Sequence, residues 1–141
     1  DAITYALAQD VDAVVDLATL TGACAVALGE LSAAIFSNRR ALSDALLDAA
    51  RGAGESLWEL PIDRRLRREM KSPVADLKNI GSGPYGGALV AGLFLKEFTA
   101  KVAWAHIDLG LSALSESDRG VVVKGGTGFG VRVLVDTLAN W

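Results

Sequence analysis

The sequence contains very few of the residues that build disulfides and metal sites. Its 141 residues include one cysteine, Cys24, and one histidine, His106. A single cysteine cannot form an internal disulfide, so the reducing cytoplasm is the expected compartment. Because Cys24 lies between two alanines, we expect a small buried side chain there rather than a reactive thiol. A catalytic zinc or manganese site needs several His, Asp, Glu or Cys ligands, so we expect no metal centre built from this chain alone.

The chain also lacks a long apolar run and an excess of positive charge. Its formal net charge is −3, which argues against a broad nucleic-acid surface. The longest apolar helical pattern, residues 87–95, is far shorter than the roughly 20 residues that span a bilayer. The sequence starts Asp-Ala-Ile, with no initiator Met and no basic N-terminal region, so we expect no secretory signal peptide. The missing Met indicates either a trimmed longer polypeptide or a mature or tagged product.

Hydrophobic residues are abundant, at 51% of the chain. Two explanations fit this composition. Either the chain forms a thoroughly buried α/β core, or other polypeptide covers apolar surface that the chain itself leaves open.

Short apolar runs alternate with helical patterns along the chain. Strands are predicted for residues 12–17, 33–37 and 102–108, and an extended connector for 58–61. Helices are predicted for residues 1–8, 23–28, 38–54, 63–71, 88–99 and 131–140, the third capped by Ser37 and Asn38. The alternation indicates an α/β fold with a mainly parallel sheet flanked by helices. Three strands are fewer than the usual 5–6 or so, which predicts an incomplete domain.

Two loops of this predicted sheet are candidates for a binding crevice. Open α/β sheets bind ligands just beyond the carboxyl ends of their strands. Residues 19–22 follow the first predicted strand and residues 109–113 follow the third. Sheet geometry alone therefore nominates these two loops as the walls of one crevice.

The polar residues near these strand ends leave alternatives open. Asp16 and Asp108 could approach one another in a site, but strand-end aspartates more often cap turns or bind backbone amides. His106 could serve as a general base or support a metal ligand, or be a hydrogen-bonded core residue. No G-x-S-x-G nucleophile motif is present.

The glycine loops and a basic cluster are also ambiguous. Residues 81–87 lack the Lys-Ser/Thr of a phosphate loop and residues 125–130 lack the dinucleotide-binding spacing, so close-packed turns are the simpler explanation. Arg64, Arg65, Arg67 and Arg68 could contact nucleic acid or a partner subunit, or form a solvated helix face.

Four stretches, taken together, resemble the leucyl (cytosol) aminopeptidase family. They are Asp16–Ala23 (DLATLTGA), Ala75–Gly81 (ADLKNIG), Trp104–Asp108 (WAHID) and Lys124–Arg132 (KGGTGFGVR). Their order and spacing match the family, and the similarity covers essentially the whole chain. The resemblance identifies the chain as the C-terminal part of a catalytic domain, residues 1–141.

The resemblance implies an enzyme that removes N-terminal residues from peptides with two divalent metal ions, Mn or Zn. Family members are typically cytoplasmic homohexamers. Their Asn-Thr-Asp-Ala-Glu-Gly-Arg motif, the other metal ligands and a catalytic Lys lie upstream of the region that matches this chain. The resemblance therefore implies no catalytic residue and no metal ligand in this chain. It also implies that the 141-residue fragment has no peptidase activity without the upstream part of the polypeptide.

What the resemblance carries over is the substrate side of the site. Thr19 and Gly22 resemble residues around the pocket for the first side chain of the peptide substrate. Leu20 resembles the residue whose backbone contacts the bound substrate. Gly110 and Ala113 correspond to the opposite wall.

This second loop departs from the family, because Asp108-Leu-Gly-Leu111 stands where many members have Asp-Ile-Ala-Gly. The missing methyl at Gly110 predicts a larger pocket, and Leu111 in place of glycine predicts a crowded turn.

Two other functions stay open from the sequence. One is a non-catalytic binding or assembly subunit that kept the fold. The other is a phosphate- or nucleotide-binding α/β domain that uses the glycine loops.

Overall fold

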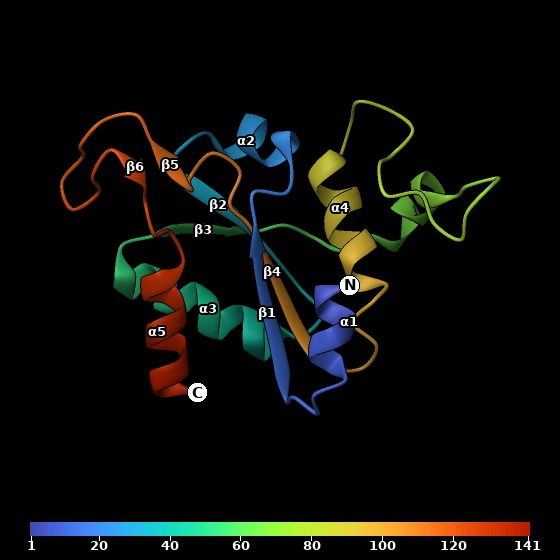
Figure 1. Ribbon diagram of the computed structural model, residues 1–141, viewed down its shortest axis with the longest axis horizontal. Helices are drawn as coiled ribbons and strands as arrows, with labels where there is room; N and C mark the ends of the chain where they lie inside the picture. The colour runs from blue at the N-terminus through green and yellow to red at the C-terminus, as the bar shows by residue number, and fades with distance from the viewer.

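A four-stranded sheet forms the centre of the molecule, in the order β1-β4-β2-β3. The computed structural model describes residues 1–141 (Figure 1). The strands are β1 (Ala13–Ala18), β2 (Ser32–Ser37), β3 (Ser56–Glu59) and β4 (Ala103–Asp108). A two-stranded ribbon, β5 (Leu114–Ser115) and β6 (Gly125–Gly126), lies apart from this sheet.

Two of the three strand pairings in the main sheet are parallel, β1 with β4 and β2 with β3. The predicted class, α/β with a mainly parallel sheet flanked by helices, is therefore confirmed. The central pairing of β2 with β4 is antiparallel, which the sequence did not indicate. The predicted connector at 58–61 was wrong in part, because its first residues belong to β3. Only Leu57 of that edge strand is buried, so the strand has little apolar pattern to detect.

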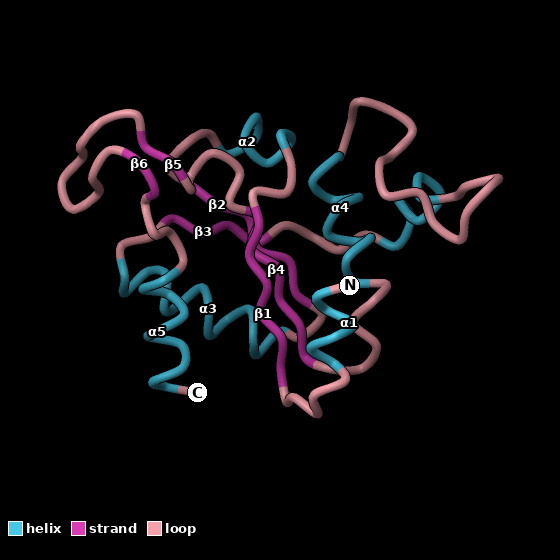
Figure 2. Tube along the Cα trace, in the orientation of Figure 1, coloured by secondary structure: helices cyan, strands magenta, loops and turns pink.

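Helices cover both faces of the sheet. They are α1 (Ala2–Leu7), α2 (Gly22–Leu28), α3 (Arg40–Ala53), the 3-10 helix η1 (Arg64–Met70), α4 (Gly87–Lys96) and α5 (Val131–Asn140). The tube trace shows α3 and α5 together on one side of the strands and α2 and α4 on the other (Figure 2). None of the helices combines the length and the apolar character needed to cross a membrane.

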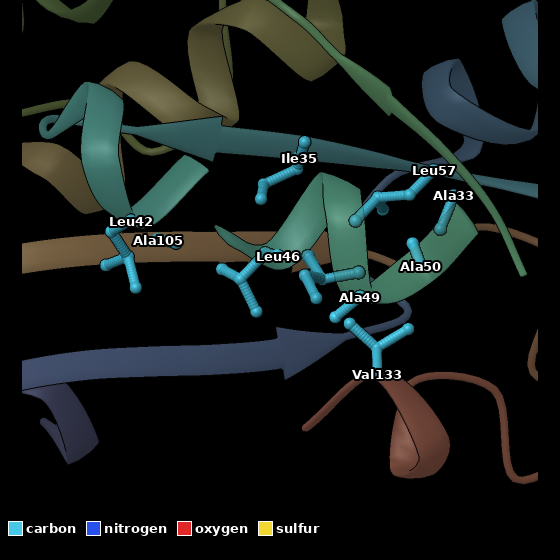
Figure 3. Packing of buried hydrophobic residues seen from close by; sticks show 10 residues of the cluster. Ala33, Ile35, Leu42, Leu46, Ala49, Ala50, Leu57, Ala105 and Val133 are labelled. Atoms are coloured by element: carbon cyan, nitrogen blue, oxygen red, sulfur yellow. The ribbon is translucent and has the colours of Figure 1, made fainter. Parts of the chain in front are cut away.

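The larger core lies between the sheet and the pair α3 and α5. Alternate residues of β2 and β4, such as Ile35 and Ile107, point into it and meet Leu42 and Leu46 from α3. Figure 3 shows the α3 side chains directed toward the strands, with Val133 of α5 closing the cluster. The alternate side chains of the strands therefore pack against the apolar stripe of α3 on this face of the sheet.

The smaller core lies on the other face, under α2 and α4. Phe36 and Trp104 come from the strands, and Cys24 and Ala88 from the two helices; all four are buried. Helix α4 approaches this layer closely at Gly92, where an added Cβ would lie 2.6 Å from the Phe36 ring. Glycine at this position lets the helix backbone rest on the aromatic side chain.

The start of α3 differs from the prediction. The helix begins at Arg40 after Arg39, and no side chain caps it. The Asn38 side chain instead joins β4, accepting from the Trp104 N–H and donating to the Val102 carbonyl, both at 2.9 Å. The Asn38 side chain thus joins the end of β2 to the start of β4 and does not cap α3.

Replacing Gly92 with Ala should destabilise the protein by about 1–2 kcal/mol, because crowding against the buried Phe36 ring outweighs the helical preference of alanine. Gly52→Ala is the matched control, since Gly52 also lies in a helix but an added Cβ meets nothing within 4 Å. This control should gain about 0.5–1 kcal/mol. Urea unfolding of both variants measures the difference; a Gly92→Ala variant as stable as the control would contradict the packing.

Candidate functional site

The two loops nominated from the sequence lie side by side at one edge of the sheet. Strands β1 and β4 are adjacent and parallel, with Ala18 opposite Asp108 at their carboxyl ends. The Leu109 N–H donates to the Ala18 carbonyl at 2.8 Å, which extends the pairing one step beyond the strands. The segments 19–22 and 109–113 therefore leave the sheet at the same point.

The Asp108 carboxylate joins these two loops. Its side chain is fully buried. Oδ1 accepts from the Leu20 and Thr21 N–H groups at 3.0 and 3.3 Å, and from the Gly110 N–H at 3.2 Å. Oδ2 accepts from the Thr21 hydroxyl at 2.6 Å. Of the two alternatives for Asp108, binding of backbone amides is the one that the structure contains.

Helix α2 starts directly from this arrangement. The Thr21 hydroxyl also accepts from the Cys24 N–H at 3.0 Å, so Thr21 is the N-cap of α2. The Cys24 Sγ donates to the backbone carbonyl of Asp108 at 3.3 Å. One threonine hydroxyl thus couples the helix start to the buried carboxylate.

An apolar cavity of about 500 Å³ lies beside the first loop. Its wall has three parts: residues 20–23, residues of the segment 79–87, and one side of α4. None of the lining residues is charged; they are Leu20, Thr21, Gly22, Ala23, Asn79, Ile80, Gly81, Gly83, Tyr85, Gly87, Val90, Ala91, Phe94 and Leu95. A cavity of this size and lining suits an apolar side chain.

The structure distributes the predicted site residues unevenly around this cavity. Leu20 and Gly22 line it, whereas Thr19, Gly110 and Ala113 do not. Thr19 is exposed at the rim of the first loop. Ala113 lies beside the glycine loop, where its carbonyl accepts from the Thr127 N–H at 3.0 Å. The substrate-binding roles of all five residues stay predictions.

The two unusual residues of the loop 109–113 lie away from this cavity, so the effect of Gly110 on the substrate pocket stays a prediction. A Cβ at Gly110 would point at the start of α2, 3.1 Å from the Ala25 nitrogen, and the backbone φ of +49° favours glycine. A methyl there would press on α2 rather than narrow the cavity. Leu111 is 56% exposed, so its side chain lies on the surface and does not crowd the turn.

Sequence reasoning missed the wall formed by segment 79–87 and α4. The stretch 75–81 carries part of the family resemblance and the glycines of 81–87 are predicted to form turns, but the sequence predicts no role for Asn79 or Ile80. The available signal was the apolar character of residues 88–95 all round the helix. Such a helix has more apolar surface than one sheet contact can bury.

His106, Asp16 and Trp104 form a separate polar group inside the smaller core. The His106 Nδ1 lies 2.5 Å from Asp16 Oδ1, and the Trp104 Nε1–H donates to Asp16 Oδ2 at 2.7 Å. The His106 ring is fully buried, roughly parallel to the Trp104 ring, and its Nε2 has no partner. His106 is thus a hydrogen-bonded core residue, and Asp16 and Asp108 bind different partners.

No group of three or more His, Cys, Asp or Glu side chains that could hold an ion comes together in the structure. Burial raises the pKa of the Cys24 thiol, and the negative charge of Asp108 raises it further. This thiol is therefore a poor ligand and a poor nucleophile.

The basic cluster on η1 is largely neutralised by nearby carboxylates. Arg65 pairs with Asp63 at 2.6 Å, Arg67 with Glu97 at 2.9 Å and Arg68 with Glu69 at 3.4 Å. The arginine side chains are exposed and their carboxylate partners are partly buried, so the cluster has the character of a solvated helix face.

The Cys24 thiol should react with Ellman's reagent on the order of 100-fold more slowly in the folded protein than in unfolded protein, because it is buried and its pKa is raised. Absorbance at pH 8, with and without guanidinium chloride, measures both rates. One thiol per chain should react promptly in guanidinium. Equally fast reaction without denaturant would contradict the burial of Cys24.

Comparisons with known proteins match the whole chain to aminopeptidases. Residues 1–135 match the family model described as "Cytosol aminopeptidase family, catalytic domain". Proteins named probable cytosol aminopeptidase are 51% identical in Synechococcus sp. (strain CC9902) and 49% identical in Prochlorococcus marinus (strain MIT 9211). Each alignment covers 100% of this chain and 28% of the relative.

A solved structure of a tomato leucine aminopeptidase mutant has the same fold. It superposes with a TM-score of 0.92 at 39% identity, over 100% of this chain and 27% of that chain. The chain thus spans little more than a quarter of the length of the proteins that it matches.

Proposed function

The chain belongs to the catalytic domain of the cytosol aminopeptidase family, and from this premise we propose that it is part of a two-metal aminopeptidase that removes leucine-like N-terminal residues from peptides. Since the chain covers 28% of its relatives, the proposal concerns the longer protein. Within it, these residues supply substrate-pocket walls, as the C-terminal portion of the catalytic domain.

The observation that carries this proposal is the uncharged cavity beside the loop 19–22, which Asp108 binds. Leu20 and Thr21, which line the cavity, follow the carboxyl end of β1, and α/β enzymes bind their ligands just beyond such strand ends. Leu20 and Gly22 on its rim are two of the residues that the family resemblance assigns to the substrate. An apolar side chain of a peptide would be desolvated against α4 and the segment 79–87.

The metal ions, Mn or Zn, are proposed to be held by other parts of the longer protein. The fully buried Asp108 already accepts four hydrogen bonds, and Asp16 is engaged by His106 and Trp104. Neither carboxylate fits a metal centre, so no chemical step is assigned to a residue of this chain.

Location and assembly follow the family in this proposal. We place the enzyme in the cytoplasm, where the lone buried thiol stays reduced, and in a homo-oligomer, a hexamer as in the family. Large apolar side chains remain exposed on the β5–β6 ribbon and its loop, among them Leu114, Val121 and Val123. Such a surface suits contact with other polypeptide.

The proposal is tested by hydrolysis of leucyl-p-nitroanilide. The longer gene product should release nitroaniline in the presence of Mn²⁺ or Zn²⁺ and lose this activity in EDTA. The isolated 141-residue chain should release none, because its residues form no metal centre.

Comparable turnover by the isolated chain would refute the assignment of catalysis to other parts of the protein. A metal-loaded longer product that binds peptides without cleaving them would favour the alternative, a binding or assembly subunit. Thermal stabilisation by a nucleotide would favour the phosphate-binding alternative.

A further inference from the structure

Asp108 is the only side chain that hydrogen-bonds to both nominated loops at once. Its two oxygens accept three backbone N–H groups and one hydroxyl: Leu20 and Thr21 from the first loop, Gly110 from the second. The Leu20 and Gly110 amides share the single oxygen Oδ1. One side-chain atom therefore bridges the two loop backbones, beyond the point where the Leu109–Ala18 hydrogen bond ends the strand pairing.

No cation pairs with this carboxylate. None of the ion pairs in the protein includes Asp108, although the side chain is fully buried. A buried carboxylate is tolerated only when hydrogen bonds replace its hydration. Because all of its side-chain donors belong to the two loops, the loops cannot move apart without leaving a buried charge unsatisfied.

The second loop is fixed from its other side as well. The Thr127 hydroxyl donates to the Ser112 carbonyl at 2.7 Å, and the Ser112 hydroxyl donates to the Leu109 carbonyl at 2.7 Å. The loop 109–113 is thus held between Asp108 and the glycine-rich loop 125–130. The first loop has no comparable support beyond Asp108 and the cap of α2, so its position depends mainly on the carboxylate.

We propose that Asp108 is a positioning residue for substrate selection: its carboxylate holds Leu20 and the cavity rim in the place where a leucine-sized side chain is preferred to a smaller one. This inference rests on the proposed function. Asp108 touches neither the substrate nor the reacting atoms in this proposal. It acts through the loop backbones that it binds.

The test measures the ratio of kcat/KM for leucyl- and alanyl-p-nitroanilide in the longer gene product. This ratio does not depend on the fraction of folded enzyme, so a purely structural loss would leave it unchanged. Asp108→Asn keeps one acceptor but replaces Oδ2 with an NH₂ group, which cannot accept the Thr21 hydroxyl proton. We expect the leucine preference to fall by about tenfold, since one methylene contact is worth 10-fold or more. The KM for the leucyl substrate should rise more than the KM for the alanyl substrate.

A second pair of variants decides the matter if Asp108→Asn does not fold. Thr21→Val removes one of the four hydrogen bonds to Asp108, together with the hydroxyl that caps α2, with little change of shape. It should lower the ratio in the same direction by a smaller factor. Thr137→Val is the matched control. It removes a buried hydroxyl that donates to the Val133 carbonyl in α5, away from the cavity, and should leave the ratio unchanged.

An active Asp108→Asn variant with an unaltered ratio overturns the inference. If that variant is unfolded, equal ratios for Thr21→Val and Thr137→Val overturn it. Absence of aminopeptidase activity in the unchanged longer protein overturns the proposed function, and this inference with it.

Discussion

The buried carboxylate of Asp108, which has hydrogen bonds but no cationic partner, organises the carboxyl ends of β1 and β4. Asp108 terminates β4, and its oxygens take hydrogen bonds from the turn after β1 and from the turn that follows β4 itself. The same residue accepts the Cys24 thiol proton through its main-chain carbonyl. The end of one strand therefore determines where two loops and one helix begin.

This arrangement requires β1 and β4 to be neighbours and parallel, because only then do their carboxyl ends coincide. The residues of β4 alternate across the sheet. Trp104 and Asp108 face α2 and α4, whereas Ala105 and Ile107 face α3. One strand thus contributes to both cores and to the strand-end site. The antiparallel partner β2 lies on its far side and adds Phe36, against which Gly92 brings α4 close. The position of α4, and so the far wall of the cavity, follows from that contact.

The sequence was sufficient for those features that have a local physical signature. The runs ending at Leu17 and Asp108 are apolar and β-branched or alternating, and both form strands: β4 is almost entirely buried, whereas β1 is partly buried along its whole length. Their adjacency followed from the general behaviour of α/β sheets. The direction of β2 could not be inferred, because a strand buried on both faces has the same pattern whichever way it runs.

The candidate site was predictable to a similar extent. The tendency of strand-end aspartates to bind amides indicated the kind of contact that Asp108 makes, but not that two loops share it. The far wall of the cavity was missed, because Ile80 and Phe94 reach it only through packing between segments distant in sequence. Asn38 shows the same limit: its capping preference is local, whereas its hydrogen bonds to β4 span more than 60 residues.

The high apolar content left open whether the chain buries its hydrophobic residues itself or presents them to other polypeptide. The structure favours the second explanation, because only 29 of 141 residues are buried. Val26 is 90% exposed on α2 and Trp141 63% exposed after α5, while β1 pairs on one side only. A protein whose unpaired strand and apolar helix faces remained in water would tend to associate. The exposed apolar surface agrees with the match to little more than a quarter of each aminopeptidase relative. Both are expected of one part of a larger catalytic domain, in which other polypeptide covers the apolar faces that this chain leaves open.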